Sequence, residues 1–118
     1  MLEPYFKAPD GGLARQLFVV DSGADVCLGP KWLCSLVGLD WDTGRPVQLR
    51  GISPREDCAV AGRIHPVDLY ILEAACQITV PFCFAEGDAP LLLGREGFFD
   101  AFRVTLDKPR LVTEFERL

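Results

Sequence analysis

Two short stretches of the sequence carry an Asp-(Ser/Thr)-Gly triplet, a pattern that can present a carboxylate on a tight loop. The first is FVVDSGAD (residues 18–25), with its acid at Asp21, and the second is WDTGRP (41–46), with its acid at Asp42. A carboxylate held in a partly desolvated position can take a proton from water and so act as a general base. The residues around each triplet indicate which of the two is placed for such chemistry.

The first triplet follows LFVV, an apolar run typical of a buried strand, and a strand that ends in a small-residue loop holds a side chain rigidly. Gly23 removes a Cβ and lets another backbone approach closely, while the Ser22 hydroxyl can tie the loop to its surroundings. Asp42 lies between Trp41 and GRP, a context typical of a surface turn. An ordinary Asx turn after a strand remains an alternative interpretation of DSGAD.

The elements that must position these residues are mainly strands. Turn signals recur at PDGG (9–12), DTGRP (42–46), GISPRED (51–57), EGDAP (86–90) and DKPR (107–110), which favours an all-β domain of about eight strands. Apolar residues alternate most clearly over 67–71 and 78–84, as in strands with one buried face. A small closed β-barrel or a sandwich fits this count, and the length of 118 residues predicts a single domain over residues 1–118.

Two short segments are predicted to be helical. In PKWLCSLVGL, Pro30 suits a helix start and Gly38 suits the C′ position, and the residues expected on one face are Trp32, Leu33, Leu36 and Val37. The second segment is GREGFFDAF (94–102), whose three phenylalanines gather on one side of a turn or two. The expected architecture is therefore a small barrel with one or two short helices.

These parts together resemble the retropepsin-like aspartic proteases, the single-lobe relatives of pepsin that act as homodimers. In that family a strand ending in D-(S/T)-G-A-D precedes a short segment that ends in glycine and an apolar residue, then a flap hairpin, and then a hydrophobic-hydrophobic-Gly-Arg motif that opens a helix. Here the parts read FVVDSGAD, KWLCSLVGL, the region from about Val47 to Leu72, and LLLGREGFF. The resemblance extends from about Leu17 to Leu106.

The resemblance implies an aspartic endopeptidase whose catalytic residue is Asp21. A chain this short has no second lobe, and Asp42 comes too soon after Asp21 to supply one, so the second carboxylate is expected from a second copy of the chain. The resemblance further implies that Ser22 bonds across the dimer and that Gly94 packs behind the loop. It also implies that Arg95 pairs with Asp25 through a guanidinium–carboxylate contact that fixes the orientation of the loop.

The expected substrate is an extended polypeptide that binds as an added strand. Residues expected to contact it are Ala24, Asp25, Gly51, Ile52 and Ser53, the last three at the tip of the flap. Retropepsin flaps usually carry adjacent glycines, whereas this tip has Gly51 alone, followed by a stiff Pro54. No cofactor and no metal is expected.

Composition bounds the remaining classes of function. The net charge of −5 argues against a nucleic-acid partner, and no apolar run suggests a membrane segment or a signal peptide, so a soluble cytoplasmic protein is expected. The five cysteines form no C-x-x-C pair and are interpreted as buried free thiols. The single histidine, His65, is interpreted as structural.

Two alternatives keep other readings of the chain open. A retropepsin fold could be catalytically silent or latent and serve as a peptide-binding or assembly module, which the proline in the flap and the short segment before the first strand favour. A small β-barrel interaction domain unrelated to proteases is the third possibility. In that case the two motifs that carry the resemblance, DSGAD and LLLGRE, occur together by coincidence.

Overall fold

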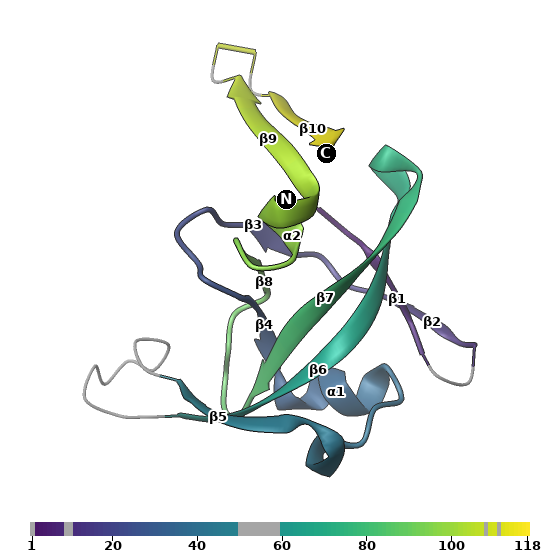
Figure 1. Cartoon of the computed structure of the whole chain (residues 1–118), viewed down its shortest axis with the longest axis vertical. Helices are drawn as coiled ribbons and strands as arrows, with labels where there is room; N and C mark the ends of the chain where they lie inside the picture. The colour runs from purple at the N-terminus through teal and green to yellow at the C-terminus, as the bar shows by residue number, and fades with distance from the viewer. Residues whose placement is uncertain (1, 9–10, 50–59, 108, 111) are drawn as a thin grey trace.

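The described part of the chain is mostly β-structure, with two short α-helices (Figure 1). The computed structural model describes residues 2–8, 11–49, 60–107, 109–110 and 112–118. Its strands are β1 (Tyr5–Lys7), β2 (Leu13–Arg15), β3 (Val19–Val20), β4 (Cys27–Pro30), β5 (Arg45–Leu49), β6 (Val60–Ile71), β7 (Cys76–Ala85), β8 (Leu92–Leu93), β9 (Phe102–Asp107) and β10 (Val112–Arg117). The helices are α1 (Lys31–Leu36) and α2 (Phe98–Ala101), and the 3₁₀ turns are η1 (Trp41–Thr43) and η2 (Leu72–Ala74).

Eight strands form one sheet in the order β2-β1-β6-β7-β4-β8-β3, with β5 paired to β6. The pairs β3–β8 and β4–β7 are parallel, whereas the hairpin of β6 and β7 is antiparallel and dominates the sheet. The sheet curls into a half-barrel, and β9 and β10 form a separate hairpin that projects from it (Figure 1). The described strands fit the predicted all-β class, and β2 and β3 lie at the two ends of the strand order.

The strands β6 and β7 confirm the predicted alternation. Val67, Leu69 and Ile71 are buried on β6, and the buried residues of β7 include Ile78, Val80, Phe82 and Phe84. The rings of Phe6, Phe18, Phe82 and Phe84 pack with centroid separations of 4.6–5.8 Å, partly edge to face. Phe18, just before β3, belongs to this buried aromatic cluster, so the strand that leads to Asp21 rests on a packed core.

Helix α1 confirms the first predicted helix, with Gly38 just beyond its end at a positive φ of 79°. The predicted buried face is partly wrong. Leu33, Cys34 and Val37 face the core, whereas Trp32 and Leu36 are about half exposed. The helix has only six residues, so it contacts the core along a narrow face. Trp32 and Leu36 are four residues apart, so they lie together on the neighbouring face, which stays in solvent.

The second predicted helix is much shorter than expected. It spans Phe98–Ala101 instead of 94–102, because Gly97 has a φ of 97° that breaks the helical path and Phe102 is already extended as the start of β9. Phe98 and Phe102 are buried, as their spacing predicted, and their rings lie 5.1 Å apart. The residues from Gly94 to Glu96 contact the Asp21 loop instead of continuing a helix.

The cysteines fit the interpretation as free thiols where the structure describes them. Cys27, Cys34 and Cys83 are free and buried, and Cys76 is free and half-buried, while Cys58 lies outside the described residues. Burial raises the pKa of the Cys83 thiol to about 11 and also raises the pKa of Cys27 and Cys34. These buried thiols therefore stay protonated at neutral pH. None of the helices that the structure describes has the length and apolarity needed to cross a membrane.

Candidate functional site

The strand β3 delivers Asp21 to the edge of the sheet. Its parallel pairing with β8 continues one residue past the strand, because the N–H of Val19 donates to Leu91 O at 2.9 Å and the N–H of Asp21 donates to Leu93 O at 3.0 Å. Asp21 itself is half-buried, and Ser22 and Gly23 beyond it are exposed. The carboxylate thus sits on backbone fixed by a sheet, with its loop open to solvent.

The loop after Asp21 is a tight turn closed by its own first residue. Asp21 Oδ1 accepts a hydrogen bond from the N–H of Gly23 at 2.8 Å, and the carbonyl of Asp21 accepts one from the N–H of Ala24 at 3.1 Å. This is the Asx geometry that the sequence allowed for either interpretation of DSGAD. It fixes one carboxylate oxygen by a backbone donor.

The segment 94–96 packs directly against this loop. The N–H of Arg95 donates to Ala24 O and the N–H of Glu96 donates to Asp25 O, both at 2.9 Å. Val26 and Glu96 form a parallel bridge at the same place. The two sequence anchors, about 70 residues apart, are therefore joined through their backbones at the site.

Arg95 and Asp25 add a side-chain contact to this junction. The guanidinium of Arg95 forms an ion pair with Oδ1 of Asp25, the contact that the resemblance implied. In the single chain the pair is exposed, with side-chain exposures of 60% for Arg95 and 82% for Asp25. Such a pair contributes little to stability while it remains in water, at most about 1 kcal/mol.

Gly94 is required by space rather than by backbone conformation. A Cβ on this residue would overlap the carbonyl group of Val26 and would lie 2.9 Å from Ala24 O. Both are backbone atoms, so neither can move aside without shifting the loop. The position of Gly94 behind the Asp21 loop is thus a consequence of how closely β8 and the loop approach each other.

The second triplet forms a different kind of turn. Asp42 is exposed in the 3₁₀ turn η1, and the side chain that caps this turn belongs to Asp40, whose Oδ1 accepts from the N–H of Asp42 at 3.1 Å. The surface turn was predicted correctly, and the residue that caps it is Asp40 and not Asp42. The turn begins one residue earlier than the triplet suggests, so Asp40 takes the capping position.

The sequence did not point to two residues that make contacts at the two triplets, Asp40 and Glu96. Asp40 could have been recognised, because an Asp two residues before a turn with Thr and Gly is a common cap. Glu96 contributes only its backbone to the loop, and a backbone contact leaves no signal in the residue type. The flap residues Gly51, Ile52 and Ser53 lie outside the described residues.

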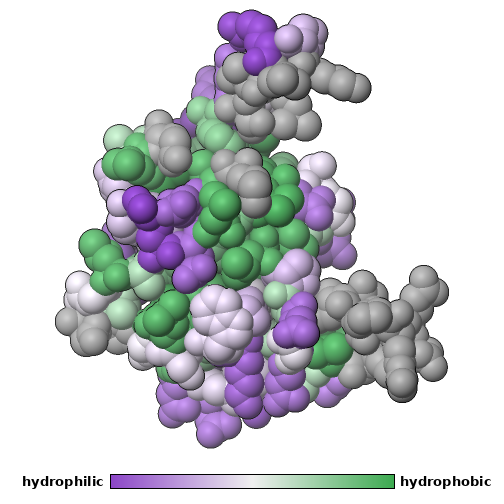
Figure 2. All heavy atoms as spheres, turned by 180° about the vertical axis from the view of Figure 1, so that it is seen from behind, coloured by the Kyte–Doolittle hydropathy of each residue, from purple (hydrophilic) through white to green (hydrophobic). Residues whose placement is uncertain are grey.

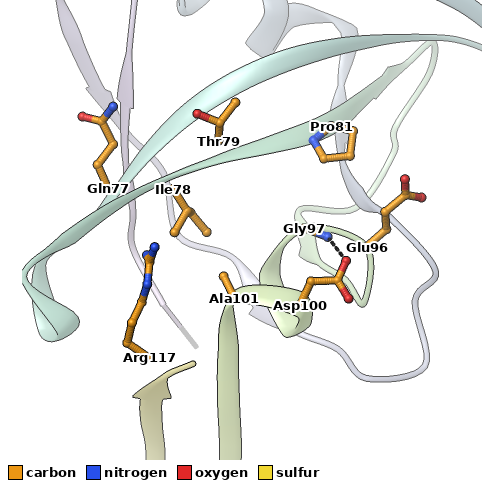
Figure 3. Close-up of a pocket in the computed structure, with 9 residues that line it drawn as sticks. All are labelled: Gln77, Ile78, Thr79, Pro81, Glu96, Gly97, Asp100, Ala101 and Arg117. Carbon is orange, nitrogen blue, oxygen red and sulfur yellow. Dashed lines mark hydrogen bonds between the residues drawn. The ribbon is translucent and has the colours of Figure 1, made fainter.

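A separate hollow of about 470 Å³ is lined by residues of β7, by Glu96 and Gly97, by α2 and by the end of β10 (Figure 3). Glu96, Asp100 and Arg117 stand around it, and the N–H of Gly97 donates to Oδ2 of Asp100 at 3.2 Å across its rim. Its lining includes neither Asp21 nor Asp25. In the described residues no group of His, Cys, Asp and Glu side chains is arranged to hold a metal ion.

Comparison of the chain with protein-family models, with curated proteins and with solved structures found no match in any of the three.

Proposed function

We propose that the chain is one subunit of a homodimeric aspartic endopeptidase of the retropepsin type, in which two copies of Asp21 activate a water molecule. The observation that supports this most is the junction at the Asp21 loop. A half-buried carboxylate stands at the end of a sheet-bound strand, and the segment 94–96 holds the loop from behind by backbone bonds and by the Arg95–Asp25 pair. This rigid mounting is what a general base needs.

The surface beside Asp21 is apolar, which favours a site that is covered in use. Val19 is 44% exposed and lies two residues before Asp21 on extended backbone, so both side chains leave the strand on the same side. Leu17, two residues earlier, is 46% exposed. Hydrophobic side chains also gather in the middle of the rear face of the molecule (Figure 2). A second subunit or a bound peptide would bury such surface.

The mechanism follows from bringing two such carboxylates together. Two Asp21 side chains within hydrogen-bonding distance share one proton, because ionising both costs too much. The ionised copy takes a proton from water as the water attacks the scissile amide carbon, and the protonated copy donates to the carbonyl oxygen. The tetrahedral intermediate then collapses with protonation of the leaving nitrogen, and no covalent enzyme intermediate forms.

The second candidate function keeps the fold and drops the chemistry. Its support is the bond from the Gly23 N–H to Asp21 Oδ1, which an Asx turn makes whether or not the carboxylate reacts. In that case the exposed surface beside Asp21 binds a peptide or a second copy without cleaving anything.

The test is an unbiased peptide-library cleavage assay on the purified chain, from acidic to neutral pH and over a wide range of protein concentration. Because the catalytic pair exists only in the dimer, activity per chain should rise with concentration and level off where sedimentation shows the dimer to be saturated. Proteolysis by a monomer at a rate independent of concentration contradicts the shared pair. A dimer that cleaves nothing at any pH favours the binding module.

A further inference from the structure

A second hollow, of about 600 Å³, lies on the face of the sheet that is turned away from the core. The described residues that line it come from β2, β1, β6, η2 and β7, and they are Leu13, Tyr5, Lys7, Tyr70, Leu72 and Gln77. Phe6 and Leu69, which pair across β1 and β6, are buried in the core. Because side chains alternate along a strand, Tyr5 and Tyr70 leave these strands on the opposite face.

Two tyrosines form the floor of this hollow. Tyr5 and Tyr70 are direct partners in the pairing of β1 with β6, and both are half-buried. Leu13 on β2 and Leu72 in η2 stand on either side of them and are 63% and 59% exposed. Aromatic and aliphatic surface of this kind gains free energy when an apolar ligand displaces water from it.

The polar groups around the floor are well placed to donate hydrogen bonds. Lys7 Nζ donates to Gln77 Oε1 at 3.1 Å, which engages the amide oxygen and leaves Gln77 its two N–H donors. The hydroxyl of Tyr5 accepts from Arg15 at 3.1 Å and can donate its own proton elsewhere. A proline residue has a carbonyl acceptor and no N–H, so a prolyl chain needs donors of this kind and offers none in return.

The charge at the hollow is positive, in a chain whose net charge is −5. Lys7 is the one charged residue among the described residues that line it. Asp68 is the partner of Lys7 in the pairing of β1 with β6, but it is not part of the lining, and its Oδ1 accepts from Thr79 Oγ1 at 2.6 Å. A ligand that carries a carboxylate beside its apolar part would therefore meet a cation here.

The spacing of the strands matches the repeat of a polyproline II helix. Neighbouring strands lie about 4.8 Å apart, so the gap between β2 and β1 is about 9.6 Å from the gap between β6 and β7. In a polyproline II helix, residues i and i+3 share one face and lie about 9.3 Å apart. Two prolines at this spacing can rest on either side of the tyrosine pair.

We propose that this hollow binds a proline-rich peptide segment with an adjoining acidic residue. The segment lies across the strands in the polyproline II form, with prolines i and i+3 flanking Tyr5 and Tyr70 and with its carboxylate near Lys7. Such a segment is stiff before it binds, so little conformational entropy is lost in ordering it. The inference does not depend on the proposed protease activity, because the hollow is lined by no residue of the Asp21 loop.

The probe for this site is a fluorescein-labelled peptide of sequence APPLPPDE, titrated with the purified chain and followed by fluorescence anisotropy. Saturable binding is expected. Replacing the four prolines by alanine (AAALAADE) should weaken binding at least about tenfold, because the ring contacts and the stiffness are both lost. Replacing the two acids by lysine (APPLPPKK) should weaken it several-fold, and Lys7→Gln should abolish this preference for the acidic peptide.

Two exposed leucines give a matched pair of variants that locates the site. Leu13→Ala should weaken binding of APPLPPDE about tenfold, because its side chain becomes buried against the peptide. Leu36→Ala removes the same atoms from the 55% exposed Leu36 of α1, outside the hollow, and should leave the affinity unchanged. Both side chains are exposed in the free chain, so both variants should fold, which circular dichroism checks.

Three results would overturn the proposal. The first is equal affinity for the proline and alanine peptides, and the second is an affinity that Leu13→Ala leaves unchanged. The third is failure of APPLPPDE to bind while sedimentation shows self-association that Leu13→Ala weakens, which would make this face a contact between two copies of the chain.

Discussion

The two Asp-(Ser/Thr)-Gly triplets of this chain fold into turns with opposite relations to the core. In the first, the acid is the structured residue: Asp21 ends a sheet-bound strand and its carboxylate accepts the Gly23 N–H, while the glycine is exposed. In the second, the glycine is the structured residue: Gly44 is buried on the ring of His65, while Asp42 is exposed. The same three-residue pattern thus holds its acid in the first turn, through a hydrogen bond, and its glycine in the second turn, through close packing.

What precedes each triplet accounts for this difference. The residues LFVV before the first triplet lead into it as strand β3, so the backbone of Asp21 is held by hydrogen bonds of the sheet. A helix, a glycine and Asp40 precede the second, so the chain is already turning and Asp40 takes the cap. Only the first triplet therefore has its acid on sheet-bound backbone with a second segment packed behind the loop, which is the arrangement that the proposed reaction needs.

The largest expected effect separates the two acids. Asp21→Asn keeps the size of the side chain and its acceptor for Gly23 N–H but removes the ionisable group, so cleavage should fall by at least about a hundredfold, the lower end of what a general base contributes. Asp42→Asn should leave cleavage within error, because that side chain is exposed and the cap is Asp40. Both variants are assayed with one peptide pool, and circular dichroism checks the fold. If Asp42→Asn loses cleavage and Asp21→Asn does not, the active site lies at the second triplet and the proposed site is wrong.

The two glycines should show the reverse order in stability. Gly44→Ala puts a methyl group into the imidazole of His65 and should lower the free energy of unfolding by about 1–3 kcal/mol, as overpacking does. Gly23→Ala meets only Asp21 Oδ1 at 3.2 Å, a side-chain atom that can shift, and should cost less than about 1 kcal/mol. Urea denaturation of the two variants measures the difference. Equal losses would contradict the packing described for Gly44.

Part of this contrast was predictable from the sequence. Period-2 alternation located β6 and β7, and the family resemblance implied that Gly94 packs behind the Asp21 loop, where the structure has it. These features depend on apolar spacing and on residues with few conformational alternatives. Sequence patterns of this kind carry over because each strand buries one face whatever its partners are.

The rest depended on tertiary contacts that leave no local signal. The second helix is short because Gly97 leaves the helical path and because Arg95 and Glu96 give their N–H groups to the loop. The described sheet is a curled half-barrel with β2 and β3 at the ends of its strand order. The burial of His65 under Gly44 joins residues 21 positions apart through a turn whose glycine has an ordinary φ of −78°, so nothing in the backbone marks it. Such close approaches are visible only once the fold is known.

The smallest expected effect concerns the support behind the first triplet, which the second lacks. Arg95→Ala should change the stability of the isolated chain by less than about 1 kcal/mol, because its pair with Asp25 is exposed. In the proposed dimer the same pair sits beside a surface that becomes covered, and an unpartnered Asp25 carboxylate then costs more, about 1–3 kcal/mol.

A double-mutant cycle of Arg95→Ala and Asp25→Asn, measured below and above the concentration at which the chain dimerises, gives the coupling free energy between the two side chains in each state. Arg103→Ala serves as the matched control, since Arg103 forms an exposed ion pair with Glu116 on the projecting hairpin. Coupling between Arg95 and Asp25 that is near zero at both concentrations shows that the loop is held by its backbone bonds alone, whereas coupling that grows on association shows that the ion pair stabilises the assembled site.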